Sequence, residues 1–167
     1  MRKKSILLSF VLVFFSIASF TIYAQDNKEA KDQSKPATFS LKDGNTYTFS
    51  ANFMYPLRGR SRSLTPPYDL TFSKDTLAGS LPYVGEAYQA SYGSRDGGVN
   101  LQTANFTYQE TKNKKGNYVI SYKVKGGQDV SDAVFTIYKD GTAELRMNFT
   151  QRQSISYRGN VTLVAAP

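Results

Sequence analysis

The chain has 167 residues, and its 21 basic and 13 acidic side chains give a formal charge of +8. It contains neither cysteine nor histidine. In this chain the first absence excludes disulfide bonds, thiolate metal sites and thiol nucleophiles, and the second excludes an imidazole base, histidine metal ligands and a serine–histidine triad. The length fits a single domain with one hydrophobic core.

Residues 1–24 predict a cleavable signal peptide. Three basic residues at positions 2–4 precede an uncharged apolar run, residues 5–20, and a short polar exit follows. This order is typical of export signals. The run has 16 residues, fewer than the ~20 that a membrane-spanning helix needs. Cleavage between Ala24 and Gln25 is therefore favoured over a retained anchor.

The predicted signal peptide also changes the charge of the exported protein. Three of the 21 basic residues lie in it, which leaves 18 basic against 13 acidic residues, an excess of +5. Such an excess is more typical of a solvated surface than of an anion-binding patch, and nucleic acid is not expected as a partner outside the cytoplasm. A lipid anchor would need a cysteine after the apolar run. We therefore expect a soluble periplasmic or extracellular protein that meets the membrane only through its signal peptide.

Residues 25–37 predict a flexible linker. They contain no large apolar side chain before Pro36, and their acidic and basic residues are equal in number. Such a segment cannot offset its ordering entropy by burial. Residues 38–167 are expected to form one all-β domain.

Apolar and polar side chains alternate through most of this domain, as in half-buried antiparallel strands. In the first run the apolar set expected on the core side is Tyr47, Phe49, Ala51, Phe53 and Tyr55. Similar runs occupy residues 68–72, 118–124 and 143–149.

The segments between these runs have the composition of turns. Asp140-Gly141 predicts a tight hairpin, and glycine-containing turns are expected at residues 113–117 and 125–128. The pattern predicts a single antiparallel β-sandwich or β-barrel of about nine or ten strands, preceded by the signal-peptide helix.

Residues 81–98 depart from the alternation. They contain four glycines and three tyrosines, followed by an Arg-Asp pair. Long irregular segments of β domains are often binding loops, and tyrosine offers a rigid ring with a polar tip. Alternatively, the tyrosines cover the core and the glycines form corners. The candidate ligand-binding residues in this segment are Tyr83, Tyr88, Tyr92, Arg95 and Asp96.

Two further candidates for ligand binding are Arg58 and Arg60, which alternate with Arg62 beside Gly59. On a strand these side chains would share one face and could bind a carboxylate or phosphate through their planar guanidinium groups. The alternative is a charged edge strand that is protected from pairing with other chains.

Catalysis has little support in the sequence. Carboxylates such as Asp69, Glu86 and Asp96 are scattered, and no two are placed at the spacing of a glycosidase pair or a calcium loop. We predict no catalytic residue, no metal site and no cofactor. The sequence favours a non-catalytic protein over an enzyme, and a glycosidase-like hydrolase is the third choice.

Several motifs occur in an order that resembles a known family: LKDG (41–44), PLRGRS (56–61), YDL (68–70), LPYVGEAY (81–88), DGGV (96–99) and QRQSISYRG (151–159). The chain resembles domain of unknown function 4251 over residues 39–163. The segments LPYVG (81–85) and RQSIS (152–156) are the most specific. The resemblance implies an exported protein of a Gram-negative bacterium. It implies no activity, and this chain departs from many members in lacking an anchoring cysteine.

Our leading hypothesis is an exported module that binds a small molecule or glycan near residues 83–96. The alternative is a structural protein that meets another envelope protein through an exposed sheet edge. A filled interior would exclude the version of the first hypothesis in which the ligand lies inside the sheet layers.

Overall fold

The computed structural model describes residues 39–86, 98–126 and 129–164. The predicted signal peptide and its Ala24–Gln25 cleavage site, like the linker, lie outside the described residues. No helix among the residues described is long and apolar enough to span a membrane. The described residues form nine strands: β1 (Tyr47–Pro56), β2 (Arg62–Phe72), β3 (Leu77–Leu81), β4 (Val99–Thr103), β5 (Phe106–Lys112), β6 (Tyr118–Val124), β7 (Val130–Ile137), β8 (Thr142–Phe149) and β9 (Ile155–Leu163).

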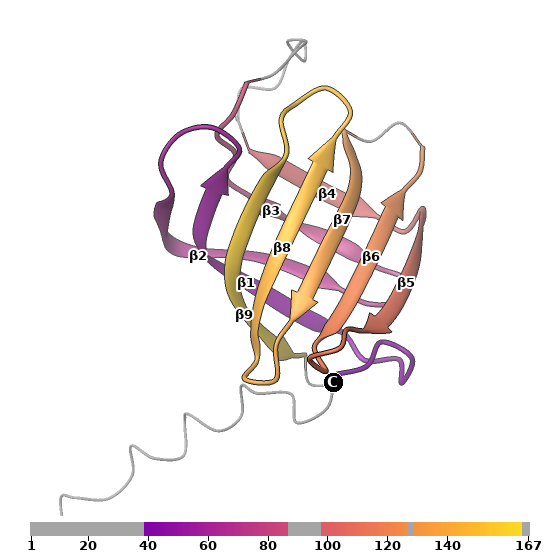
Figure 1. Cartoon of the computed structure of the whole chain (residues 1–167). Coiled ribbons are helices and arrows are strands. Elements are labelled where there is room, and N and C mark those ends of the chain that lie inside the picture. Colours follow the sequence, from indigo (N-terminus) through magenta and orange to yellow (C-terminus); the bar gives the residue numbers. More distant parts are fainter. Residues whose placement is uncertain (1–38, 87–97, 127–128, 165–167) are drawn as a thin grey trace, which may run out of the picture. The chain divides into compact units, whose positions relative to one another are not determined.

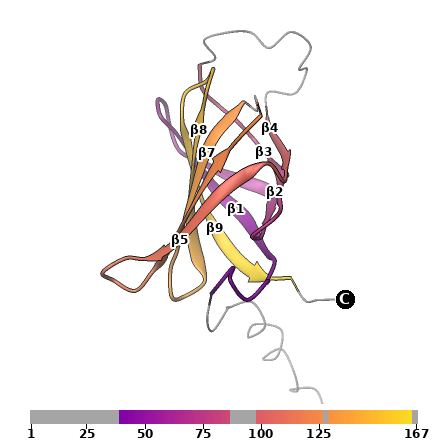
Figure 2. The ribbon, with the colours of Figure 1, turned by 90° about the vertical axis from the view of Figure 1, so that its right-hand side faces the viewer.

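All nine strands belong to one antiparallel sheet with the order β4-β3-β2-β1-β9-β8-β7-β6-β5. The sheet curls so that β1 to β4 pass behind β5 to β9, which gives a nearly closed barrel (Figures 1 and 2). The prediction of an all-β antiparallel domain is confirmed. The curled sheet is held together where β1 pairs with β9, the first and last strands of the chain.

The barrel stays open between its edge strands, β4 and β5. Each neighbouring pair in the sheet is antiparallel, so the first and ninth strands of the order run in the same direction. Antiparallel pairing therefore cannot close this sheet. Only Ala104 and Asn105 separate β4 from β5. Through this short connection the chain passes from the part of the sheet formed by β1 to β4 to the part formed by β5 to β9.

Aromatic side chains fill the interior of the barrel. The rings of Phe72 and Phe135 stack with their centres 4.4 Å apart, and the ring of Phe39 lies 4.2 Å from that of Tyr47. Leu41 is fully buried, and its N–H donates a hydrogen bond to the Glu110 carboxylate on β5 at 3.0 Å. The packing of these side chains argues against a ligand site inside the barrel.

The expected core face of β1 is correct only for its first half. Tyr47, Phe49 and Ala51 are buried, but Phe53 and Tyr55 are 44% and 41% exposed. A β-bulge shifts the register against both β2 and β9 between Ala51 and Phe53. One extra residue in a strand moves the following side chains to the opposite face. Phe53 and Tyr55 therefore lie on the outside of the barrel.

The partner strand suggests why the irregularity occurs here. β2 places four residues, 64–67, between the two residues that pair with Ala51 and Phe53. Pro66 and Pro67 have no backbone N–H and cannot donate to the ladder. The regular register is therefore interrupted on both strands at this point.

The predicted Asp-Gly hairpin is confirmed between β7 and β8. Gly141 has a φ of 81°, and the Tyr138 N–H donates to the Thr142 carbonyl oxygen at 2.9 Å. The Asp140 carboxylate accepts a hydrogen bond from the Thr142 N–H at 3.0 Å. Local turn chemistry thus sets the register of these two strands.

Two buried tyrosine hydroxyls make the stability of the domain sensitive to alkali. Tyr122 donates to the Ser73 carbonyl oxygen at 2.8 Å, and burial, with Tyr108 and Glu110 nearby, raises the pKa of Tyr122 well above its usual range. Burial likewise raises the pKa of Tyr157, although Arg152 opposes the shift. The unfolded chain loses these protons near pH 10 while the folded chain keeps them. The contribution of these two groups to the free energy of unfolding should be fully present below pH 10. Above pH 10 the free energy of unfolding should fall by about 1.4 kcal/mol per pH unit for each tyrosine.

Replacing Tyr122 with phenylalanine tests this dependence. At pH 7 the variant should lose about 1 kcal/mol of unfolding free energy with its hydrogen bond. Between pH 10 and 11 it should lose less stability than the wild type, because it has one fewer proton to release. Urea unfolding at pH 7, 10 and 11 measures both effects. Parallel losses in the two proteins above pH 10 would show that the Tyr122 hydroxyl is not the titrating group.

Candidate functional site

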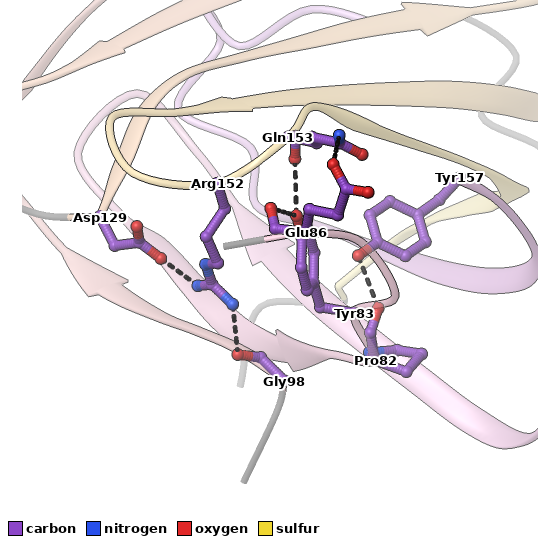
Figure 3. Close-up of polar contacts among 8 residues, drawn as sticks. All are labelled: Pro82, Tyr83, Glu86, Gly98, Asp129, Arg152, Gln153 and Tyr157. Atoms are coloured by element: carbon purple, nitrogen blue, oxygen red, sulfur yellow. Dashed lines mark hydrogen bonds and ion pairs between the residues drawn. The ribbon is translucent and has the colours of Figure 1, made fainter. Parts of the chain in front are cut away.

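The segment that follows β3 lies against the connection between β8 and β9 (Figure 3). The Tyr83 hydroxyl donates a hydrogen bond to the Gln153 carbonyl oxygen at 3.0 Å. Gln153 donates from its backbone N–H to the Glu86 carbonyl oxygen at 3.1 Å and from its side-chain amide to the Glu86 carboxylate at 2.7 Å. The Tyr157 hydroxyl donates to the Pro82 carbonyl oxygen at 2.7 Å. The Tyr83–Gln153 bond joins the two segments that are most specific in the family resemblance, and the other bonds lie beside it.

Arg152, in the β8–β9 connection, contacts three parts of the chain. Its guanidinium lies 4.6 Å from the ring centre of Tyr83 and 4.8 Å from that of Phe149. It donates to the Gly98 carbonyl oxygen at 3.2 Å and forms an ion pair with Asp129. It therefore fastens the β3–β4 and β6–β7 connections to the β8–β9 connection. We call the set drawn in Figure 3 the anchor cluster; it comprises Pro82, Tyr83, Glu86, Gly98, Asp129, Arg152, Gln153 and Tyr157.

The carboxylates of the anchor cluster are engaged in contacts within the protein. Asp129 faces the Arg152 guanidinium, and Glu86 accepts a hydrogen bond from Gln153 and lies 3.6 Å from Nη1 of Arg58. Within the described ranges, no group of three acidic side chains is placed to hold a metal ion. The cluster is thus suited to fastening loops, and it offers no free acid–base pair.

A hollow of about 470 Å³ lies on the outer face of β1, β9, β8 and β7. We call it the outer hollow; its exposed and half-buried lining residues are Tyr55, Val134, Thr136, Glu144, Arg146 and Ser156. Two buried residues also line it, Leu145 and Tyr157, and Tyr157 is shared with the anchor cluster. Figure 1 shows this face of β7, β8 and β9 toward the viewer. Its volume falls within the range of small-molecule sites.

Strand register places the residues of the outer hollow side by side. Tyr55 pairs with Ser156, Ser156 with Arg146, and Arg146 with Val134, so these four form one row across the sheet. Glu144 lies in the next row. Tyr55 belongs to this outer row because the bulge in β1 turns it away from the core.

The outer hollow contains one carboxylate and one guanidinium. Glu144 lies opposite Arg158 in the register of β8 and β9. Burial, together with the nearby Glu144 carboxylate, raises the pKa of Tyr138. Arg146 is exposed and forms no ion pair in the part of the chain that the structure describes. The site can therefore donate and accept hydrogen bonds and offers the exposed ring of Tyr55.

The structure corrects one expectation about the predicted binding residues. Arg58 and Arg60 do not share a strand face, because residues 57–61 form the connection between β1 and β2 and Gly59 adopts a φ of 106°. The alternative, an edge strand, does not apply to these two loop residues either; Arg62 begins β2, and β2 pairs with β3 only at residues 70–72, so this start of β2 is bonded to β1 alone. Arg58 is 76% exposed beside Glu86.

The other predicted residues fall into two groups. Tyr83 is half-buried in the anchor cluster, where both its ring and its hydroxyl make contacts. Four more lie outside the described residues, and their role stays a prediction: Tyr88, Tyr92, Arg95 and Asp96.

Sequence reasoning missed the outer hollow. Glu144 and Arg146 follow the expected alternation of β8 and point outward, but nothing in that pattern distinguishes them from other surface residues. The position of Tyr55 depends on the bulge, for which Pro66-Pro67 on the partner strand was the available signal.

The sequence matches the family model described as "Domain of unknown function (DUF4251)" over residues 29–161. The chain belongs to this family. The crystal structure of a DUF4251 family protein from Bacteroides eggerthii is similar to this DUF4251 domain, with a TM-score of 0.50 and 17% sequence identity over 73% of this chain and 82% of that one. At this identity the likeness shows the fold alone. No curated protein matches the sequence.

Proposed function

We propose that this DUF4251 domain is a non-catalytic, exported binding module of the periplasm or envelope, and that its ligand occupies the outer hollow. The observation that carries the proposal is the composition of that hollow. An exposed aromatic ring, a carboxylate, two hydroxyls and a guanidinium that forms no ion pair with any described residue surround about 470 Å³. A few converging polar groups beside apolar surface are typical of ligand sites.

The anchor cluster is a weaker candidate for ligand binding. Tyr83 already donates its hydroxyl to Gln153 and stacks against Arg152. A ligand that used these groups would first have to break contacts within the protein. The described residues therefore favour the outer hollow over the expected site around Tyr83.

The carboxylates support a non-catalytic role. Glycosidases need two carboxyl groups that face each other across the substrate. The outer hollow has Glu144 as its single acidic lining residue among those described, and Glu86 and Asp129 are engaged in the anchor cluster. Binding without turnover fits this distribution of charges.

Replacing Arg146 with alanine tests the proposed site. A thermal-shift screen of glycans, peptides, lipids and small anions should find a ligand that raises the melting temperature. A ligand present at 100 times its dissociation constant stabilises the folded state by about 2.7 kcal/mol. Arg146→Ala should weaken its binding at least tenfold without changing the melting temperature of the free protein, because Arg146 is exposed and forms no ion pair within residues 39–86, 98–126 and 129–164.

Arg60→Ala is the matched control, since it removes an exposed arginine from a loop outside the hollow. It should leave the affinity unchanged. Equal losses in the two variants, or no stabilising compound in the whole screen, would contradict the proposed site.

A second candidate function is assembly with another envelope protein through the open sheet edge. The observation that favours it is the pair of edge strands β4 and β5, which antiparallel pairing cannot join. An added strand from a partner would bind their free backbone groups. Hydrogen exchange distinguishes the two functions, because a partner of this kind protects amides of β4 or β5, whereas a ligand in the outer hollow does not.

A further inference from the structure

The charges of the outer hollow restrict the class of its ligand. Glu144 and Arg146 lie two residues apart on β8 and both point outward. An anionic ligand would meet the Glu144 carboxylate, and a cationic ligand would meet the Arg146 guanidinium. An apolar ligand would remove water from both without replacing the hydrogen bonds. A neutral ligand with many hydroxyl groups can accept from Arg146 and donate to Glu144 at the same time.

The exposed ring of Tyr55 adds a flat apolar surface beside these polar groups. It is 41% exposed and stands at the end of the row that contains Ser156 and Arg146. A pyranose ring has one face of C–H groups that packs on an aromatic ring, while its hydroxyls remain at the edge for hydrogen bonding. Ser156 and Thr136 provide further hydroxyls at the hollow.

The backbone beneath the hollow disfavours an extended peptide. Peptides that bind to sheets gain much of their affinity from main-chain hydrogen bonds at a free edge. Here β9, β8 and β7 are each paired on both sides. A peptide lying on this face would find no free backbone partners, whereas a saccharide needs only side chains.

We infer that the outer hollow binds a neutral saccharide, packed on Tyr55 and hydrogen-bonded by Arg146 and Glu144. This inference rests on the proposed function and adds the class of ligand. The volume of about 470 Å³ is that of a small-molecule site. It can hold a short saccharide but cannot enclose a long polymer.

Calorimetric titration of the purified protein tests the inference. The probes are neutral di- and trisaccharides of glucose, galactose, mannose and N-acetylglucosamine, with uronic acid oligomers and short peptides as comparisons. At least one neutral saccharide should bind, and more tightly than every charged probe. Tyr55→Ala should weaken its binding at least tenfold, and Tyr55→Phe, which keeps the ring, should retain most of it.

Phe53→Ala provides a matched control. Phe53 is an exposed aromatic residue on the same strand, 44% exposed, but it is not among the residues that line the hollow. It should change the affinity by less than twofold. An equal loss on Phe53→Ala and Tyr55→Ala would overturn the role of the Tyr55 ring.

The outcomes separate the ligand class from the proposed function. If a peptide or anionic probe binds and Arg146→Ala abolishes that binding, the saccharide inference is wrong and the proposed site stands. If neutral saccharides bind but none of the hollow variants weakens them, both the site and the inference fail. If no probe of any class binds, both fail as well.

Discussion

Replacing Gly159 with valine is expected to lower the free energy of unfolding by about 3 kcal/mol or more. Gly159 on β9 pairs with Ala51 on β1 and with Ala143 on β8. A Cβ atom at this position would overlap the carbonyl oxygen of Ser50, and it would lie 2.7 Å from the Ser50 carbonyl carbon and 3.0 Å from the Ala51 Cα. These are backbone atoms in the middle of a paired strand, so they cannot move aside without breaking the β1–β9 ladder.

The consequence should be large because this ladder joins the two ends of the sheet. β1 carries β2, β3 and β4, and β9 carries the remaining four strands. Asn160→Val is the matched control, since its side chain is exposed and valine suits a strand. Urea unfolding should show a much lower midpoint for Gly159→Val and little change for Asn160→Val. Equal midpoints in the two variants would mean that β1 does not approach β9 as closely as the structure shows.

Arg152→Ala is expected to have the second largest effect, a loss of about 2 to 3 kcal/mol of unfolding free energy. The Arg152 side chain is 19% exposed, and its guanidinium packs against the rings of Tyr83 and Phe149 and faces Asp129. Alanine would remove the packing of both rings and leave the Asp129 carboxylate without its cation. It would also leave the Gly98 carbonyl oxygen without this donor.

Two further substitutions separate the contributions at Arg152. Arg152→Lys should recover less than half of the loss, because lysine keeps the charge but not the planar group that stacks and donates in two directions. Arg58→Ala should cost less than about 0.5 kcal/mol, since both side chains of its ion pair are mostly exposed. Full recovery by lysine would show that charge alone matters in the anchor cluster.

Much of the fold could be predicted because its signals are local. The period of two in β6 and β8 and the Asp140-Gly141 turn depend on residues close together in the chain. The bulge in β1 could not be predicted this way, since a single inserted residue leaves no mark on the alternation of Phe53 and Tyr55. It depends on how β1 fits both β2 and β9.

The sites were harder to predict because they combine distant residues. LPYVG and RQSIS were singled out by resemblance, yet their contact joins Tyr83 to Gln153 across 70 positions. The outer hollow draws on four strands, and its residues become neighbours only through the register of β1, β9, β8 and β7. For Arg58 and Arg60, the alternating pattern resembled a strand, whereas the left-handed conformation of Gly59 makes a loop.

Chemical-shift mapping of the ¹⁵N-labelled protein tests the proposed site most directly. The protein is titrated with the tightest ligand from the screen, and the backbone amide signals are followed. The largest changes should occur at Tyr55, Glu144, Arg146 and Ser156, and the signals of Tyr83, Asp129 and Gln153 in the anchor cluster should stay in place. Changes centred on the anchor cluster, with none at the outer hollow, would contradict the proposed function.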